Sequence, residues 1–363
     1  MYKDTRLAGV EKWYHLPPKD AYMRVPDNIP KCICYLCYKI GGGAAAGKYN
    51  AIGTGFIVKV EEFGYSFIYV VTARHVIDEH KRTKTDQLYL RLNTRAGGVD
   101  YFQVDMKQSG WIFPEEESID LAFIQIQIPH SDFDFLEVPI EMTATLEVWN
   151  EQYIGIGDEI FVTGLFTHRK GLERNFPIVR TGIISAMPFE AIYDKKTGDY
   201  FPAFLAELRS IGGLSGSPVF IYLNKYREPK PKLPEGRDSV FYLLGIIRGH
   251  WELDEDEGGN KLPKKDSFKD DVRIGYSKGE NLNVGIGLVT PAHQLWLALK
   301  SESVRNMRKQ LAKMLDEMED TFVEDSSGIP EESSDAFTKD SFENALKKVS
   351  RKTSEPDEEK KQT

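Results

Sequence analysis

The chain is short of cysteine, of long apolar runs and of basic charge, and each shortage excludes a class of protein. Its 363 residues contain three cysteines and carry a formal net charge of -9. No segment approaches the run of about 20 apolar residues that a membrane-spanning helix needs. The acidic balance argues against broad neutralisation of nucleic-acid phosphates. We therefore expect no membrane span and no nucleic-acid partner.

The N-terminal segment also lacks the apolar stretch and the small-residue cleavage site of a secretory signal peptide. Instead, prolines interrupt it at Pro17, Pro18, Pro26 and Pro30. Because proline breaks regular structure, we expect an irregular arm over 1–30 and no secretion signal.

The three cysteines lie together in KCICYLCYK, so the chain has no spaced pairs from which to build a disulfide framework. Their C-x-C-x-x-C spacing raises the alternative of a metal site. In a strand, however, Cys32 and Cys34 would face one way and Cys37 the other. We expect reduced thiols, no bound metal and a reducing compartment, the cytoplasm.

Two series of short apolar runs, rich in β-branched and aromatic residues, predict an all-β protein. The first series, over about 31–128, contains CICYLCYKI, AIGTGFIVKV, YSFIYVVTA, QLYLRL, DYFQVDM and DLAFIQIQI. The second, over about 153–290, contains DEIFVTGLF, PIVRTGIISAM, AFLAEL, SPVFIYL, FYLLGIIRG and NVGIGLVT. About six strands in each series predict two antiparallel six-stranded β-barrels side by side.

Charged segments with proline or glycine interrupt and follow the second series. Those at 225–239 and 252–273 are expected to be surface loops. Over 291–322 the pattern is that of an amphipathic helix, with an apolar stripe of Val304, Met307, Leu311, Met314 and Met318. This helix packs on its own barrel or supports self-association through 304–318. The polar segment 323–363 is expected to be disordered.

Three short motifs bring a histidine, an aspartate and a serine into the chain in that order. His75 follows a strand-like run in YVVTARHVI, Asp120 opens one in SIDLAFIQI, and Ser215 lies in GGLSGSPVF. Acyl transfer needs a serine hydroxyl, a base that takes its proton and a carboxylate that orients the base. It also needs backbone N–H groups directed at the oxyanion, which a turn with Gly213 and Ser215 can supply. The motifs predict a catalytic triad.

These motifs resemble those of the trypsin-like (chymotrypsin-fold) serine peptidases, over about residues 31–300. GTGFIV, VVTARHVI and IDLAFIQI are similar to the first barrel of that family, and GDEIFVTG, RTGIISA, GLSGSPVF and VGIGLVT to the second. The likeness is nearest to the HtrA-like branch, although the residues after 300 are too few and too polar for its PDZ domain. The resemblance implies a serine endopeptidase that acts on a protein or peptide substrate without a cofactor.

The resemblance also assigns a role to each motif residue. Ser215 would be the nucleophile, His75 the general base and then the general acid, and Asp120 the orienting carboxylate. The backbone amides of Gly213 and Ser215 would form the oxyanion hole. Together they would hydrolyse a peptide bond through an acyl-enzyme intermediate.

For the substrate pocket, the resemblance indicates Arg209, Arg248 and Gly249. A cation at Arg209 would favour an acidic substrate side chain through charge-assisted hydrogen bonds, unless that side chain faces solvent. Leu214 stands where many digestive relatives carry an aspartate that pairs with a newly cut N-terminus. We therefore expect no activation of that kind.

Other interpretations stay open at this point. An α/β-hydrolase would need a helix after its serine elbow and a histidine further on, at His250 or His293. The run PVFIYL after Ser215 predicts a strand instead. Ser217 is the competing serine, although it precedes Pro218. Finally, the domain would be a catalytically inactive scaffold or binding module if the fold had been kept without its activity.

Overall fold

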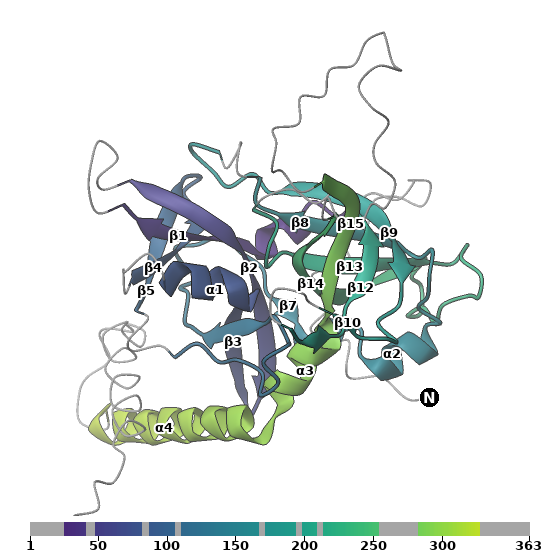
Figure 1. Cartoon of the computed structure of the whole chain (residues 1–363). Helices are drawn as coiled ribbons and strands as arrows, with labels where there is room; N and C mark the ends of the chain where they lie inside the picture. The colour runs from purple at the N-terminus through teal and green to yellow at the C-terminus, as the bar shows by residue number, and fades with distance from the viewer. Residues whose placement is uncertain are drawn as a thin grey trace, which may run out of the picture.

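The computed structural model describes residues 25–40, 48–81, 87–105, 110–166, 171–193, 198–208, 213–253 and 282–326. They form two β-rich halves that lie side by side, with helices at the C-terminal end (Figure 1). No helix in this part of the chain is long and apolar enough to cross a membrane. Most of the predicted arm over 1–30, the insertion at 252–273 and the tail over 323–363 lies outside the described residues.

The first half is a seven-stranded sheet in the order β5-β4-β1-β2-β3-β6, with β7 paired in parallel to β2. Its strands are β1 (Ile33–Lys39), β2 (Tyr49–Glu62), β3 (Tyr65–Thr72), β4 (Gln87–Asn93), β5 (Val99–Asp105), β6 (Ala122–Gln125) and β7 (Val138–Pro139). Helix α1 (Arg74–Lys81) follows β3 directly. No ladder joins β5 to β6 within the described residues, so closure of a first barrel stays a prediction.

The second half is a closed six-stranded barrel in the order β12-β15-β14-β13-β8-β9, which confirms one of the two predicted barrels. Its strands are β8 (Glu159–Gly164), β9 (Ile178–Ala186), β12 (Phe204–Glu207), β13 (Pro218–Asn224), β14 (Ser239–Leu253) and β15 (Leu282–Pro291). A small hairpin of β10 (Ile192–Tyr193) and β11 (Tyr200–Phe201) stands between β9 and β12. Helix α2 (Leu146–Glu151) precedes the barrel.

Side chains that alternate between the two faces of the first-half strands pack into two apolar cores. In β1, Cys34 and Leu36 face a core confined to the first half, whereas Ile33 and Tyr35 face a larger core that continues into the barrel. Successive side chains of a strand point to opposite faces, so a strand buried on both faces reads as a continuous apolar run. The shared core packs the two halves against each other.

The cysteines follow this arrangement with one correction. All three are free and buried, but Cys32 shares a core with Cys37 and not with Cys34. The predicted orientation of Cys32 was wrong because this residue ends a 3-10 helix, Ile29–Cys32, one position before β1 begins. Burial raises the pKa of Cys32 and Cys34 far above its usual range. Both thiols are therefore protonated at neutral pH.

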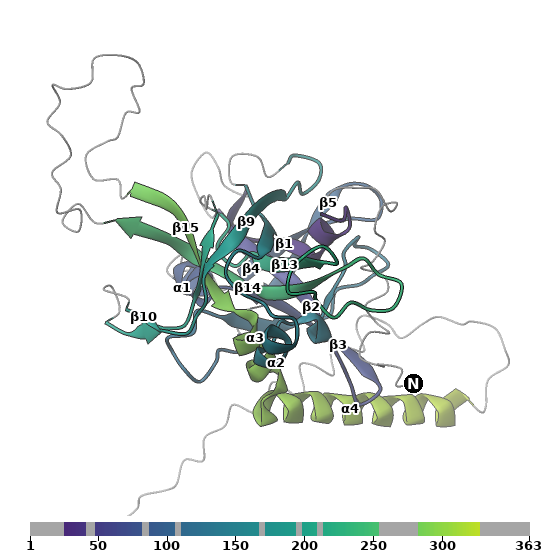
Figure 2. The same cartoon turned by 90° about the vertical axis from the view of Figure 1, so that its right-hand side faces the viewer.

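Two helices occupy the region for which the sequence predicts one. Helix α3 (Ala292–Lys300) and helix α4 (Glu302–Ser326) are separated at Ser301, whose ψ of 152° is extended. Helix α3 contacts β14 and β15, and α4 runs along the edge of the first half (Figures 1 and 2).

Helix α4 packs on its own domain through a face that differs from the predicted methionine stripe. Val304 and Leu311 are buried, but Met307 is half exposed. Between them Arg308 is fully buried, and it donates hydrogen bonds to Glu62 at 2.8 Å and to the Tyr69 hydroxyl at 3.2 Å. Self-association through 304–318 stays a prediction, although Val304 and Leu311 of the stripe pack within the chain.

Ion pairs also secure the insertion at 225–239, which the structure shows as a surface loop after β13. The guanidinium of Arg227 donates to both carboxylate oxygens of Asp158, which precedes β8.

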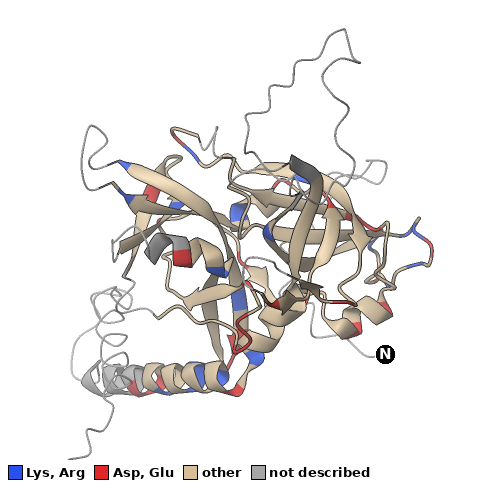
Figure 3. Ribbon diagram, viewed as in Figure 1, with Lys and Arg blue, Asp and Glu red and all other residues tan. Residues whose placement is uncertain are grey.

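Elsewhere on the ribbon of the described residues, basic and acidic positions are interspersed (Figure 3).

Candidate active site

His75 and Asp120 are joined by two hydrogen bonds at the edge of the first half. The Nδ1 atom of His75 lies 2.8 Å from Oδ2 of Asp120, and the backbone N–H of His75 donates to Oδ1 at 2.9 Å. The histidine stands in the first turn of α1, and the aspartate precedes β6, which pairs with β3. Because β3 leads into α1, this pairing brings the two residues together. The His75 side chain is 37% exposed and that of Asp120 is 8% exposed.

The surroundings of Asp120 keep its carboxyl group ionised. Burial acts to raise its pKa, but the hydrogen bonds and the charge of His75 outweigh burial and hold the pKa below its usual value. The positive charge of Arg248 lowers the pKa further. A buried carboxylate that accepts two hydrogen bonds is thus the anionic partner of the histidine ring.

Ser215 lies in the second half, on a turn that leads into β13. Gly213 and Gly216 flank it with φ values of 97° and 83°, which glycine adopts without a steric penalty. A Cβ at Gly216 would lie 2.2 Å from the Thr54 carbonyl oxygen and 3.1 Å from the Ala73 nitrogen. The turn is therefore packed against the segment that leads to His75. Leu214 is buried in the shared core and anchors the turn.

Thr54 of β2 connects this turn to the first half. The sequence motifs assigned it no role. Its backbone N–H donates to the Ser215 carbonyl at 3.0 Å, and its hydroxyl donates to the Gly213 carbonyl at 2.8 Å. The same hydroxyl accepts from the Leu165 N–H at 2.9 Å. Its place in the GTGFIV motif was a signal, but only the folded chain shows what its hydroxyl contacts.

The structure separates the two candidate serines by burial. Ser217 is fully buried, and its hydroxyl occupies the space that a Cβ on Gly164 would need. Ser215 is only partly buried. Its hydroxyl makes no hydrogen bond to His75 among the described residues, so the structure joins two of the three predicted triad side chains directly and places the third on the adjoining turn.

The residues predicted for the substrate pocket have different places. Arg209 lies outside the described residues. Arg248 of β14 donates to the Ser118 carbonyl at 2.9 Å and lies over the Phe201 ring at 3.7 Å. Gly249 pairs with Leu288 of β15, and a Cβ on it would meet no atom within 4 Å. Arg248 thus bridges the barrel to the loop before Asp120.

The element that follows Ser215 bears on the α/β-hydrolase interpretation. The chain after Ser215 continues as strand β13 and not as a helix, which contradicts an α/β-hydrolase elbow. No group of three or more His, Cys, Asp or Glu side chains in the described part of the chain is placed to hold a metal ion.

Comparison with known proteins agrees with the motif resemblance. Residues 53–224 match the family model described as a trypsin-like peptidase domain. This range holds His75, Asp120 and Ser215 and spans the junction of the two halves. No curated protein matches the chain. The chain carries a trypsin-like serine peptidase domain.

Proposed function

We propose that the domain is a serine endopeptidase in which His75, Asp120 and Ser215 form the catalytic triad. The observation that carries the proposal is the paired contact of Asp120 with the ring and the backbone of His75. This contact holds Nδ1 as the protonated nitrogen and leaves Nε2 to accept the proton of Ser215. The ionised Asp120 then stabilises the imidazolium that forms.

In the proposed reaction, Oγ of Ser215 attacks the scissile carbonyl carbon while His75 takes the hydroxyl proton. His75 returns that proton to the leaving amine, and an acyl-enzyme remains. A water molecule, deprotonated by His75, then releases the acid and regenerates Ser215. These steps need only side chains and backbone amides, so the proposal includes no cofactor.

The amides of Gly213 and Ser215 are the proposed oxyanion hole. Among the described residues, neither N–H donates to a backbone carbonyl, whereas the next amide, that of Gly216, donates to Ile247 at 2.9 Å. Fixed amides that stabilise the developing charge contribute the largest share of catalysis in many acyl transfers. The hydrogen bond from Thr54 to the Gly213 carbonyl fixes the peptide group between these two amides.

The same proposal extends to the fold and the location of the protein. The first-half sheet would be the first barrel of a two-barrel chymotrypsin-like fold. The three free, buried thiols support a reducing compartment, which we propose to be the cytoplasm. The substrate would be a protein or a peptide.

A second candidate function is that of an inactive scaffold, and one observation favours it. The Ser215 hydroxyl makes no hydrogen bond to the His75 ring among the described residues. In unliganded serine hydrolases such contacts are often long and tighten only with substrate.

Reaction with a fluorophosphonate separates the two functions, because the reagent needs an activated serine. Purified full-length protein should be labelled at Ser215, and folded protein that is not labelled would support the scaffold.

A further inference from the structure

Arg180 of β9 is a cation whose charge no acidic side chain of the described residues balances. Its side chain is partly buried, and its Nε atom is buried without a hydrogen-bond partner in the described part of the chain. No ion pair joins it to a carboxylate among those residues. A buried donor on a charged group is costly to leave unpaired, so such a group is usually found where a ligand or ion binds.

The strand register places Arg180 at the end of the barrel that carries Ser215. Arg180 pairs with Val162 of β8, and Val162 pairs with Val219 of β13, the strand that begins just after the Ser215 turn. Directly paired residues on neighbouring strands point to the same face. Val162 and Val219 are fully buried, so Arg180 shares a face of the sheet with two core residues, at the end of β9 that lies toward the Ser215 turn.

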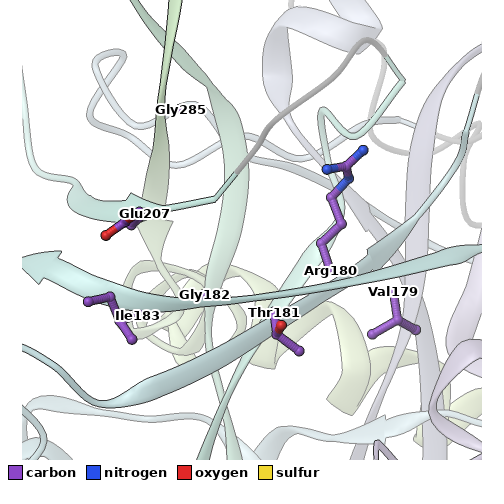
Figure 4. Close-up of a pocket in the computed structure, with 7 residues that line it drawn as sticks. All are labelled: Val179, Arg180, Thr181, Gly182, Ile183, Glu207 and Gly285. Atoms are coloured by element: carbon purple, nitrogen blue, oxygen red, sulfur yellow. The ribbon is translucent and has the colours of Figure 1, made fainter.

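A pocket of about 740 Å³ adjoins this side chain, lined by Val179, Arg180, Thr181, Gly182, Ile183, Glu207 and Gly285. Figure 4 shows Arg180 on one side of β9, while Val179, Thr181 and Ile183 point to the other side. A Cβ on Gly285 would meet no atom within 4 Å, so this wall of the pocket is open. The pocket is therefore large enough for a substrate side chain and has a guanidinium at one wall.

Glu207 is the acidic residue of the same pocket, but its carboxylate does not neutralise Arg180. It lies apart from the guanidinium in Figure 4, and no ion pair joins the two side chains. Glu207 is exposed, so water and salt screen its charge more than that of the partly buried Arg180. Arg180 is therefore a cation of this pocket that no carboxylate of the described residues neutralises.

We propose that Arg180 determines specificity by binding an acidic side chain of the substrate next to the scissile bond. This inference rests on the proposed function. A guanidinium forms two parallel hydrogen bonds with a carboxylate, and a neutral amide of the same shape cannot match their charge. The role that the sequence suggested for Arg209 would then belong, at least in part, to a residue of β9.

Labelling by peptide phosphonate esters tests this inference. Two peptide diphenyl phosphonates are compared that differ only in a Glu-like or a Gln-like side chain beside the phosphorus. The Ser215 oxygen forms a bond to phosphorus as one phenyl ester leaves as phenol. We expect the acidic probe to react about tenfold faster or more, the size expected for one charge-assisted contact. Arg180→Met should remove this preference, and Arg180→Glu should favour a Lys-like probe. Lys309→Met, on the exposed face of α4, is the matched control and should keep the preference for the acidic probe.

A fluorophosphonate without a peptide side chain separates this inference from the proposed function. Because it does not use the pocket, its labelling rate is the reference by which the phosphonate rates of wild type and Arg180→Met are each divided. If it labels neither, the proposed function fails. The specificity is then still measurable as the difference in Kd between Glu and Gln peptides bound to Ser215→Ala. Equal phosphonate rates, or equal Kd values, for the acidic and amide ligands would overturn the role of Arg180.

Discussion

The two halves of the domain hold their parts of the site in different ways. In the first half, His75 and Asp120 are joined by direct hydrogen bonds to one carboxylate. In the second half, Ser215 sits on a glycine turn whose contacts are mainly through the backbone, to Thr54 of the first half and to Ile247 of the barrel. The proposed acid–base pair is thus complete within one half, whereas the placement of the proposed nucleophile depends on the alignment of both.

This difference predicts how substitutions in each half should affect catalysis. Changes in the first half should alter the chemistry of His75 while its geometry is kept by α1 and β6. Changes at the junction should alter the placement of Ser215 and of the oxyanion amides. The predictions at Asp120, Thr54 and Arg248 compare these two kinds of effect.

The largest effect is expected at Asp120, inside the self-contained pair. Asp120→Asn removes the charge that stabilises the imidazolium and permits the wrong tautomer of His75. We expect turnover to fall by up to about 10⁴-fold with the fold intact. Labelling rates, with circular dichroism as the check on folding, measure this. A loss of less than tenfold would show that the pair does not act as base and carboxylate.

A stability effect is expected where the first half meets α4. Glu62 accepts hydrogen bonds from Arg305 and from the fully buried Arg308. Glu62→Gln leaves Arg308 without its counter-ion and should lower the free energy of unfolding by about 3 kcal/mol. Glu159→Gln, on an exposed position of β8, is the control and should change it little.

The same variant has a pH dependence whose sign follows from the contacts of Glu62. Burial acts to raise its pKa, but the hydrogen bonds from the two arginines lower it below the ordinary value of 4.5. A carboxyl with a lowered pKa in the folded state contributes stability above the unfolded pKa and loses it as the pH falls through the folded value. The difference in the free energy of unfolding between wild type and Glu62→Gln should therefore be largest at pH 7 and shrink below about pH 4. A gap that widens in acid would contradict the ion pair.

A smaller effect on catalysis is expected at the junction. Thr54→Val removes the hydrogen bond to the Gly213 carbonyl and leaves the Leu165 amide without its acceptor. Because this contact fixes the peptide group between the two proposed oxyanion donors and does not supply a donor, we expect kcat to fall by about tenfold, with KM little changed. Thr54→Ser keeps the hydroxyl and should recover most of the rate. Equal losses in Thr54→Ser and Thr54→Val would mean that the hydroxyl has no such role.

The smallest effect is expected at Arg248, the side chain that links the barrel to the loop before Asp120. Its charge lowers the pKa of Asp120, and a cation at this place also disfavours a second positive charge on His75. In Arg248→Met, the rising limb of the pH profile of kcat/KM should move to higher pH by less than about one unit. A shift to lower pH would show that the charge of Arg248 does not act on the pair.

Much of this site could be predicted from the sequence because its motifs are local. A strand followed by TARH, a DLA at a strand start and a glycine-flanked serine each describe a short segment, and the structure places His75 and Asp120 in contact. The contacts of Thr54 and Arg180 depend on which strands pair and in what register. No local pattern carries that information.

The helical region shows a second limit of sequence patterns. The predicted stripe included Met307 in the buried face of α4, but the structure leaves Met307 half exposed and buries the neighbouring Arg308. A charged residue is buried there because Glu62 and Tyr69, far away in the sequence, provide its partners. Likewise, the 3-10 turn that ends at Cys32 changed the side to which that thiol points.

Fluorophosphonate labelling followed by peptide mapping tests the central claim most directly. The account predicts one modified serine, Ser215, in the full-length chain without prior proteolysis. His75→Ala should lose labelling nearly as fully as Ser215→Ala, since without the base the hydroxyl stays protonated at neutral pH. The double variant should be little worse than either single one, because the triad acts as a unit. Labelling that survives Ser215→Ala, or folded wild-type protein that is never labelled, would contradict the account.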